Sequence, residues 1–348
     1  MRIAAFSERL GPPFDEGIKN FALHLIQALG AEHDVLALTS GGSTVAGQGI
    51  VDTDANRLLL SWPLWRALRA FRPQLIVYVP TACGTVFSFL RARVLRLLAC
   101  GAPVGLIALQ PRPHSTLGEW WIRRLTPDHA FAQSRRTTDT LAQLGCQATL
   151  LPPAVDVQRF RPASPAVKAT LRQEHGIPVD AKVATHVGHL KSKRNLTEIA
   201  TLHGSGRFHA VIVGSSSTEQ DQVLKQSLQG SGCTVIDHYV QDIADIYRLS
   251  DVYLFLSEEP TAAIEMPLSV LEAMASNLPV VCTPFGGLPD AFEPGDGLVY
   301  WEGHSPVIES IATALSTPCA TRALVEEHTW PALAQTIVQH LQRRASLP

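Results

Sequence analysis

The hydrophobic positions of the chain form short apolar runs separated by amphipathic segments. In the first half, runs typical of buried strands occur at 1–6, 35–39, 75–79, 103–109 and 129–133. Between them apolar residues recur at helical spacing, for example at Phe21, Leu25 and Leu29. Strands that alternate with helices predict a parallel sheet covered by helices.

The second half repeats this alternation. Strand patterns at 183–187, 209–213, 233–237 and 252–256 alternate with helical patterns at 195–202, 220–228 and 243–249. The segment 151–165 is rich in proline and lacks either period, which indicates a linker. We therefore expect two doubly wound α/β domains, 1–163 and 164–329. A last amphipathic helix lies within 330–348; packing against the first domain is one arrangement, and composition does not decide between the domains.

The stretch 264–290 combines a helix, a strand and a glycine turn. Pro267 suits the start of a helix, and Glu265 and Glu272 place two carboxylates near that start. After the apolar run that follows, Gly286 and Gly287 form a turn that can present backbone N–H groups to an anion. The pattern suggests a phosphate and a polyol bound side by side.

Composition narrows the class of protein. The chain has 348 residues, of which 46% are hydrophobic and 17% charged, so an intrinsically disordered chain is excluded. Its six cysteines have no C-x-x-C spacing, which indicates neither a disulfide framework nor a zinc site. No signal peptide or apolar membrane span is visible, so we expect a cytoplasmic protein.

Charge is distributed unevenly. Residues 1–163 contain 17 Lys and Arg against 11 Asp and Glu, a net charge of +6, whereas the whole chain has −2. Part of this excess is interleaved with aromatic residues: Arg91, Arg93, Arg96, Arg112, Arg123 and Arg124 with Phe87, Phe89, Trp120 and Trp121. The pattern fits a surface for a membrane or an anionic acceptor. Solvated arginines on amphipathic helices are the alternative.

Three motifs in order carry a resemblance to a known family: LPPAVDVQRFRP, VGHLKSKRNL and PLSVLEAMASNLPVVCTPFGGLPD. In this order and spacing the chain resembles the retaining, nucleotide-sugar-dependent glycosyltransferases of family 4. The resemblance spans nearly the whole chain. It implies the GT-B fold, in which two Rossmann-like domains with doubly wound parallel sheets face a central cleft.

The resemblance also implies a donor site. Glu272 matches the second glutamate of the family's E-x7-E motif, which binds the ribose hydroxyls. Arg194 occupies the place of a lysine beside the diphosphate, where a fixed cation stabilises the leaving group without a metal. The other matches are positions whose backbone approaches the donor: Gly17, Gly188, Gly286, Gly287 and Leu288. The structural alternatives are a helix-entry carboxylate for Glu272, a simple turn for the glycines and a solvated charge cluster for Arg194.

Two positions depart from the family pattern. His189 replaces an arginine, so the second phosphate cation is either a titrating imidazole or absent. The first glutamate of the E-x7-E motif would fall on Ile264, and the nearest carboxylate is Glu265. We predict that Glu265 takes the catalytic role together with Arg194; the alternatives are Glu258 or Glu259, or loss of the role.

The expected activity is transfer of a sugar from a nucleotide-diphosphate sugar to an acceptor hydroxyl, with retention of configuration, in glycan or glycoconjugate biosynthesis. No cofactor or metal is expected, and no nucleic acid partner. The acceptor is a glycan, a lipid-linked sugar or a small molecule, and Gln110, Arg112 and His114 follow a strand end where it would bind. Peripheral contact with a membrane is included in this prediction. A GT-B epimerase and a non-catalytic GT-B subunit are the alternatives.

Overall fold

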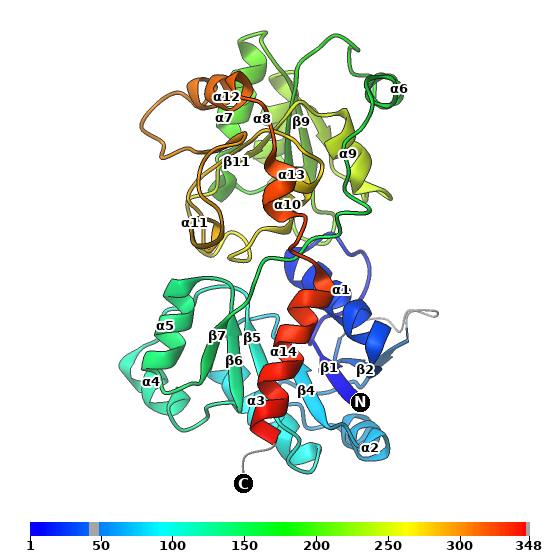
Figure 1. Ribbon diagram of the computed structural model, residues 1–348, viewed down its shortest axis with the longest axis vertical. Coiled ribbons are helices and arrows are strands. Elements are labelled where there is room, and N and C mark those ends of the chain that lie inside the picture. The colour runs from blue at the N-terminus through cyan, green and yellow to red at the C-terminus, as the bar shows by residue number, and fades with distance from the viewer. Residues whose placement is uncertain (42–48, 346–348) are drawn as a thin grey trace. The chain divides into compact units, whose positions relative to one another are not determined.

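The computed structural model describes residues 1–41 and 49–345, and contacts divide them into two compact units (Figure 1). Unit 1 contains Met1–Pro152, Ala263–Glu265 and the chain from Trp330, and unit 2 contains Pro153–Ala262 and Met266–Thr329. The first boundary therefore follows Pro152, whereas the sequence suggested residue 163. The segment between these positions belongs to unit 2 because Arg322 donates hydrogen bonds to the carbonyls of Val157 and Phe160.

Unit 1 is a Rossmann-like domain whose described strands are all parallel, in the order β3-β2-β1-β4-β5-β6-β7. Its elements are β1 (Arg2–Phe6), α1 (Gly17–Glu32), β2 (Asp34–Thr39), β3 (Ile50–Asp52), α2 (Trp62–Phe71), β4 (Leu75–Tyr78), α3 (Val86–Leu98), β5 (Val104–Ala108), α4 (Thr116–Ile122), β6 (His129–Ala132), α5 (Arg135–Gln143), β7 (Ala148–Leu150) and α14 (Trp330–Ala345).

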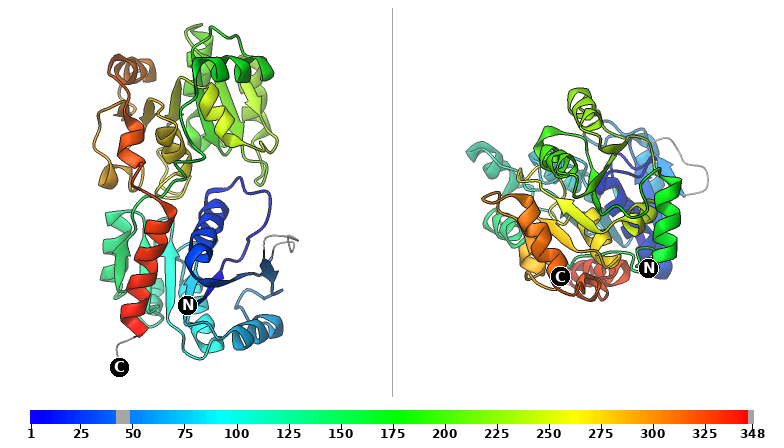
Figure 2. Two further views of the ribbon diagram at one scale, coloured as in Figure 1. Left: turned by 45° about the vertical axis from the view of Figure 1, so that its right-hand side comes forward. Right: turned by 90° about the horizontal axis from the view of Figure 1, so that it is seen from above.

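Helices cover the two faces of this sheet. Leu68 of α2, Phe89 of α3, Ile122 of α4 and Leu141 of α5 belong to one buried cluster with strand residues. The helices α1 and α14 pack against each other and lie close together in the ribbon views (Figures 1 and 2). Phe21 of α1 is in edge contact with Trp330 of α14. The C-terminal helix, whose domain the sequence left open, therefore belongs to unit 1.

Unit 2 is a second parallel-sheet domain, with described strands in the order β10-β9-β8-β11-β12-β13. Its elements are α6 (Pro165–Glu174), β8 (Val183–Gly188), the 3-10 turn η1 (Ser192–Arg194), α7 (Leu196–Gly204), β9 (His209–Gly214), α8 (Gln222–Gly230), β10 (Thr234–Ile236), α9 (Ile243–Leu249), β11 (Val252–Phe255), α10 (Leu268–Ala275), β12 (Val280–Cys282), α11 (Leu288–Ala291), β13 (Leu298–Tyr300), α12 (Val307–Ser316) and α13 (Thr321–Val325).

The strands of unit 2 are buried on both faces. Leu202 of α7 and Ile311 of α12 belong to one apolar cluster, and Leu171 of α6 and Ile246 of α9 belong to another. A strand enclosed in this way reads as a continuous apolar run, which is why the sequence identified it. The two parallel-sheet units confirm the predicted α/β fold class.

No helix in the described part of the chain has the length and hydrophobicity needed to cross a membrane.

Candidate functional site

The first group of predicted site residues lies where the strand order of unit 2 reverses. The strands β8 and β11 are neighbours, but β8 leads to β9 on one side and β11 leads to β12 on the other. Ligands of open α/β sheets bind beyond the carboxyl ends of strands at such a point. Gly188 ends β8, and His189 and Arg194 follow it within the next six residues.

Arg194 is a buried cation without a carboxylate partner among the described residues. Arg194 is only 4% exposed. Its Nη2 donates a hydrogen bond to Ala262 O at 2.6 Å, and its Cζ lies 5.4 Å from the centre of the Phe255 ring. Burial lowers the pKa of Arg194 to about 10, so the guanidinium remains charged at neutral pH. A buried charge is costly unless it is paired, so this arrangement favours binding of an anion.

Gly188 is held close to two side chains of this site. A Cβ atom at Gly188 would lie 3.0 Å from His186 Nε2 and 3.5 Å from Arg194 Nη1. Both side chains are buried, so they have little room to move away from an added Cβ atom. Glycine at the end of β8 therefore allows Arg194 to lie against the backbone.

His186 is a component of the site that the sequence reasoning missed. Its Nδ1 lies 2.9 Å from Leu254 O, so this nitrogen carries the proton and donates it. Burial and the charge of Arg194 lower the pKa of His186 to about 3, which leaves the ring neutral. Its buried Nε2, an acceptor, has no hydrogen-bond partner among the described residues. No sequence motif marks this histidine within an apolar strand.

We expect Gly188→Ala to destabilise the protein by about 1–3 kcal/mol, because the added methyl group overpacks the site beside His186. Urea denaturation measures the change. Gly204→Ala is the matched control, since a Cβ there meets nothing within 4 Å. Equal stabilities of the two variants would contradict the steric role of Gly188.

His189, the predicted replacement for a phosphate-binding arginine, points its Nδ1 at Thr218 Oγ1 at a distance of 2.7 Å. The hydroxyl of Thr218 is therefore the hydrogen-bond partner of this ring nitrogen of His189. Its role toward a phosphate stays a prediction.

Glu272 lies in α10, where its Oε2 accepts a hydrogen bond from Tyr247 OH at 2.6 Å. Burial raises the pKa of Glu272, and the Tyr247 bond and the charge of Arg159 oppose this shift. Tyr247 is itself fully buried, which together with Glu272 raises the pKa of its hydroxyl well above the ordinary value. The tyrosine thus positions the carboxylate and leaves its other oxygen for a further donor.

The raised pKa of Glu272 predicts a pH-dependent stability. Because folding favours the protonated acid, this carboxyl group costs stability as pH rises from its unfolded-state pKa of 4.5 through the higher folded-state value. We expect Glu272→Gln to gain stability relative to the native protein as pH rises from about 4 to about 7. Denaturant unfolding at several pH values tests this, with the exposed Glu327→Gln as control. A difference that does not change with pH would contradict the assignment.

The glycine turn after β12 presents free backbone donors. Gly286 has a φ of +56°, which glycine adopts without strain, and Gly287 is the N-cap residue of α11. The N–H groups of Gly286 and Gly287 donate to no acceptor among the described residues. The third predicted donor differs, because Leu288 N–H is already bonded to Phe285 O at 3.0 Å.

Glu265 has a different environment from Glu272. It belongs to unit 1, is 3% exposed, and its N–H donates to Leu109 O at 2.7 Å. Its Oε1 accepts hydrogen bonds from Ser134 Oγ at 2.7 Å and Thr137 Oγ1 at 2.6 Å, at the N-terminus of α5. The carboxylate therefore stabilises the start of this helix. Its catalytic role stays a prediction.

The other glutamates considered for that role lie in unit 2 near the end of β11. Glu259 forms an ion pair with Lys193 Nζ at 2.5 Å, and both side chains are well exposed. Glu258 Oε1 lies close to Gly303, at 3.2 Å from the position of a Cβ there. Because Glu259 pairs with Lys193, its carboxylate does not pair with the next residue, Arg194.

Gly17 is the first residue of α1. A Cβ there would lie 3.6 Å from side-chain carbons of Ile264, an ordinary contact distance. Gly17, a predicted donor position, and Ile264, where the first glutamate of the E-x7-E motif was expected, therefore lie side by side in unit 1.

Two of the predicted acceptor residues, which follow β5, contact each other. Gln110 Nε2 donates to Ala263 O at 2.9 Å, and Arg112 Nη2 donates to Gln110 Oε1 at 3.4 Å. Arg112 Nε also donates to Ala82 O at 3.2 Å, and no described carboxylate forms an ion pair with it. His114 lies two residues further, and burial lowers its pKa. A half-buried guanidinium at a strand end is suited to an anionic or hydroxylated ligand.

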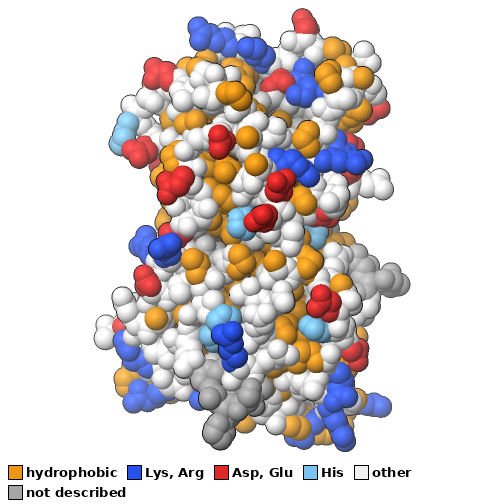
Figure 3. Space-filling model, viewed as in Figure 1, with side chains coloured by type: hydrophobic (Ala, Val, Ile, Leu, Met, Phe, Trp, Pro, Cys, Tyr) orange, Lys and Arg blue, Asp and Glu red, His pale blue; other side chains and the backbone are white. Residues whose placement is uncertain are grey.

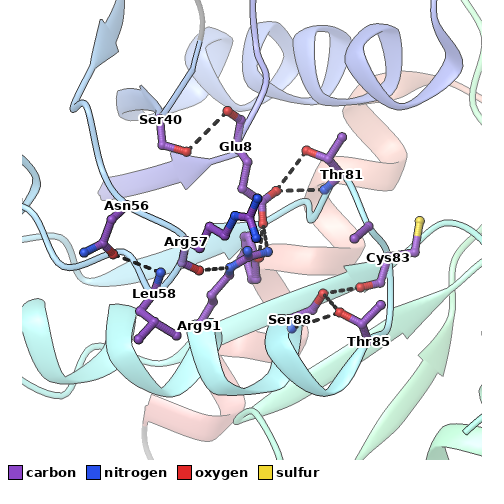
Figure 4. A network of polar contacts seen from close by, with 12 residues as sticks. Glu8, Ser40, Asn56, Arg57, Leu58, Thr81, Cys83, Thr85, Ser88 and Arg91 are labelled. Carbon is purple, nitrogen blue, oxygen red and sulfur yellow. Dashed lines mark hydrogen bonds and ion pairs between the residues drawn. The ribbon is translucent and has the colours of Figure 1, made fainter.

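A carboxylate network in unit 1 was not identified from the sequence (Figure 4). Glu8, which follows β1, accepts from Thr81 N at 2.7 Å, from Arg91 Nη1 at 2.9 Å and from Tyr78 OH. Both charged side chains are less than 15% exposed. Glu8 thus joins the loops after β1 and β4, the reversal point of this sheet. Only the tertiary structure brings these residues together, so no local signal could reveal the network.

Within the described residues, no group of three or more His, Cys, Asp or Glu side chains is arranged to hold a metal ion.

The fold and the site define a GT-B protein with two Rossmann-like units. A solved structure of Anabaena Alr3699/HepE in complex with UDP has a TM-score of 0.76 and 15% identity, covering 99% of this chain and 100% of that one. Residues 182–343 match the family model described as glycosyl transferases group 1. The family match and the fold both agree with the resemblance that the sequence motifs suggested.

Curated relatives extend the comparison. D-inositol 3-phosphate glycosyltransferase of Corynebacterium jeikeium is 31% identical over 176 residues, covering 46% of this chain and 41% of the relative. GDP-mannose-dependent alpha-mannosyltransferase of Mycobacterium tuberculosis is 26% identical over 292 residues, covering 80% and 75%. The chain thus spans less than half of the first relative and three quarters of the second.

Proposed function

We propose that the protein is a glycosyltransferase that moves a sugar from a nucleotide-diphosphate sugar to an acceptor hydroxyl with retention of configuration. The observation that carries this proposal is the buried guanidinium of Arg194 beside the carboxyl end of β8, which forms no ion pair with a carboxylate of the described residues. The family of residues 182–343 and the names of the curated relatives support it. Glycan or glycoconjugate biosynthesis is the process that such a reaction would serve.

In this proposal unit 2 binds the donor. Arg194 pairs with the diphosphate, the N–H groups of Gly286 and Gly287 bind phosphate or sugar oxygens, and Glu272 accepts hydrogen bonds from the ribose hydroxyls. The UDP named for the Anabaena structure is a ligand of this chemical class. The residues Gly188 and His189 flank the same strand end. The role of Gly17 toward the donor stays a prediction.

The main requirement of the reaction is that the negative charge on the departing diphosphate is stabilised. As the bond to the sugar breaks, negative charge grows on the phosphate oxygen, and a fixed guanidinium stabilises it without solvent reorganisation. We propose that Arg194 supplies this stabilisation and that no metal ion takes part. We propose that Glu265 also takes part in catalysis.

The acceptor is proposed to bind to unit 1 near Gln110, Arg112 and His114. Arg112 retains hydrogen-bonding capacity beyond its bonds to Ala82 O and Gln110 Oε1, so it can bind an oxygen of the acceptor. Glycans, lipid-linked sugars and small molecules all carry suitable groups.

The test is nucleotide release by the purified protein from a panel of UDP-, GDP- and dTDP-sugars, with and without EDTA. We expect release from one nucleotide class, unchanged by EDTA. Analysis of the sugar after incubation with donor alone separates transfer or hydrolysis from epimerisation. Absence of both binding and turnover with every donor would overturn the proposal.

A further inference from the structure

The helices α2, α3 and α4 lie on one face of the sheet of unit 1, which α5 also covers. Right-handed crossovers from β3 to β4, from β4 to β5 and from β5 to β6 all proceed in one direction along the sheet, so their helices cover the same face. The helices α2 and α4 each pack against α3, and all three contribute to one buried cluster. We call the outer surface of residues 57–124 on these helices the basic aromatic face.

The charge of this segment is strongly one-sided. Residues 57–124 contain ten arginines, no lysine and one acidic residue, Glu119, which gives a net charge of 10 − 1 = +9. Two arginines are neutralised within the unit, since Arg91 pairs with Glu8 and Arg96 with Asp128. Arg66, Arg69, Arg123 and Arg124 are exposed and form no ion pair with a described residue. An anionic partner would complement this charge.

Large apolar side chains accompany these arginines at the surface. Eight of the fourteen exposed large hydrophobic residues in the described chain belong to this segment: Leu58, Leu60, Trp62, Phe87, Leu97, Leu117, Trp120 and Trp121. In Figure 3 basic and hydrophobic side chains lie together over the parts of unit 1 that Figure 1 labels α2 and α4. Phe89, by contrast, is fully buried, so the sequence-based surface included one core residue.

Two tryptophan pairs mark the two sides of the face. Trp62 is 68% exposed and stacks on Trp65 in α2, with Arg69 5.7 Å above the Trp65 ring. In α4, Trp120 and Trp121 are 44% and 46% exposed. The guanidinium of Arg124 lies 3.6 Å from the centre of the Trp120 ring. Tryptophan and arginine in this combination suit the boundary between lipid headgroups and acyl chains.

We propose that the basic aromatic face binds the surface of a membrane that contains anionic lipids. The exposed arginines pair with lipid phosphates, and the tryptophans with Phe87 and Leu117 enter the headgroup region. Solvation alone explains exposed arginines, but it does not explain why the same three helices also expose six large apolar residues. This inference concerns unit 1 and is independent of the donor chemistry proposed for unit 2.

Vesicle co-sedimentation of the full chain tests the proposal. We expect binding to phosphatidylcholine vesicles that contain about 30% phosphatidylglycerol and little binding to pure phosphatidylcholine. Raising the salt concentration from about 0.1 M to about 0.5 M should weaken binding, because exposed charges are screened. Equal binding to both kinds of vesicle, or binding to neither, would overturn the inference.

Surface variants assign the contact. Arg66→Gln, Arg69→Gln, Arg123→Gln and Arg124→Gln together should lower the vesicle partition coefficient by more than about tenfold, since each arginine near the surface contributes about fivefold. Trp62→Gln with Trp120→Gln should also lower it. The control changes two exposed residues of unit 2, Val223→Gln and Arg207→Gln, and should bind like the native protein.

Circular dichroism and nucleotide release by each variant show that the fold and unit 2 are intact. Unchanged vesicle binding by both the arginine and the tryptophan variants would refute the proposed face. Preferential binding of duplex DNA over anionic vesicles would equally refute it. Loss of vesicle binding with unchanged nucleotide release would support it and leave the donor proposal standing.

Discussion

Arg194→Gln is expected to raise the Kd for the nucleotide-sugar donor by at least about 30-fold, because it removes the buried charge that we propose pairs with the diphosphate. The same change should leave the free energy of unfolding within about 1 kcal/mol of the native value. The guanidinium has no carboxylate partner among the described residues, and glutamine can still donate a hydrogen bond toward Ala262 O. A residue kept for stability would show the opposite pattern.

Isothermal titration calorimetry with the donor class found in the panel, together with urea denaturation, measures both quantities. Lys193→Gln is the matched control, since Lys193 is the preceding residue but is 55% exposed and pairs with Glu259. Its donor affinity should stay within about threefold of the native value, as for most surface ion pairs. Native affinity in Arg194→Gln would refute the diphosphate site, whereas lost stability with retained affinity would assign Arg194 a structural role.

Substitution of Glu265 is expected to have the second large effect. Glu265→Ala should affect stability, and Glu265→Gln should affect catalysis. Glu265→Ala leaves the buried hydroxyls of Ser134 and Thr137 without their acceptor and should cost about 1–3 kcal/mol of stability. Glu265→Gln keeps an oxygen that accepts both hydrogen bonds and should fold almost as stably. If the carboxylate also takes part in catalysis, Glu265→Gln lowers kcat by at least about 100-fold with little change in the KM for the donor.

Denaturation and steady-state kinetics separate these roles. Glu259→Gln in the exposed part of the same loop is the control and should change neither stability nor kcat by much. Thr137→Val tests the helix contact from the other side, because it removes one hydroxyl while nearly preserving shape. A Glu265→Gln enzyme with native kcat would restrict Glu265 to the support of α5 and would return Glu258 and Glu259 to consideration.

The fold was predictable from the sequence to a large extent because most strands lie in the middle of parallel sheets. Residues such as 75–79 and 252–256 are covered on both faces and therefore form unbroken apolar runs. The short strands β3, β7 and β13 were not predicted. Each has three residues and lies at or near an edge of its sheet, where neither length nor periodicity produces a clear signal.

The sequence could suggest candidate site residues where they belong to one local segment. Glu272, Gly286 and Gly287 follow one another through a helix, a strand and a turn, and the order of these elements is written in the chain. Leu288 shows the limit of such reasoning, because only the folded turn reveals that its N–H already bonds to Phe285 O.

The sequence by itself determined the two α/β domains and the motifs that resemble a known family, and it suggested the chemical types of residue proposed to hold a phosphate and a sugar. Periodicity and glycine placement depend on local sterics, which neighbouring residues fix. Only the tertiary structure decided that no carboxylate of the described residues pairs with Arg194 and that Glu265 supports α5. It likewise placed His186 beside Gly188 and joined Glu8 to Arg91. These facts depend on contacts between distant segments, and burial, which sets the cost of each charge, exists only after the chain has folded.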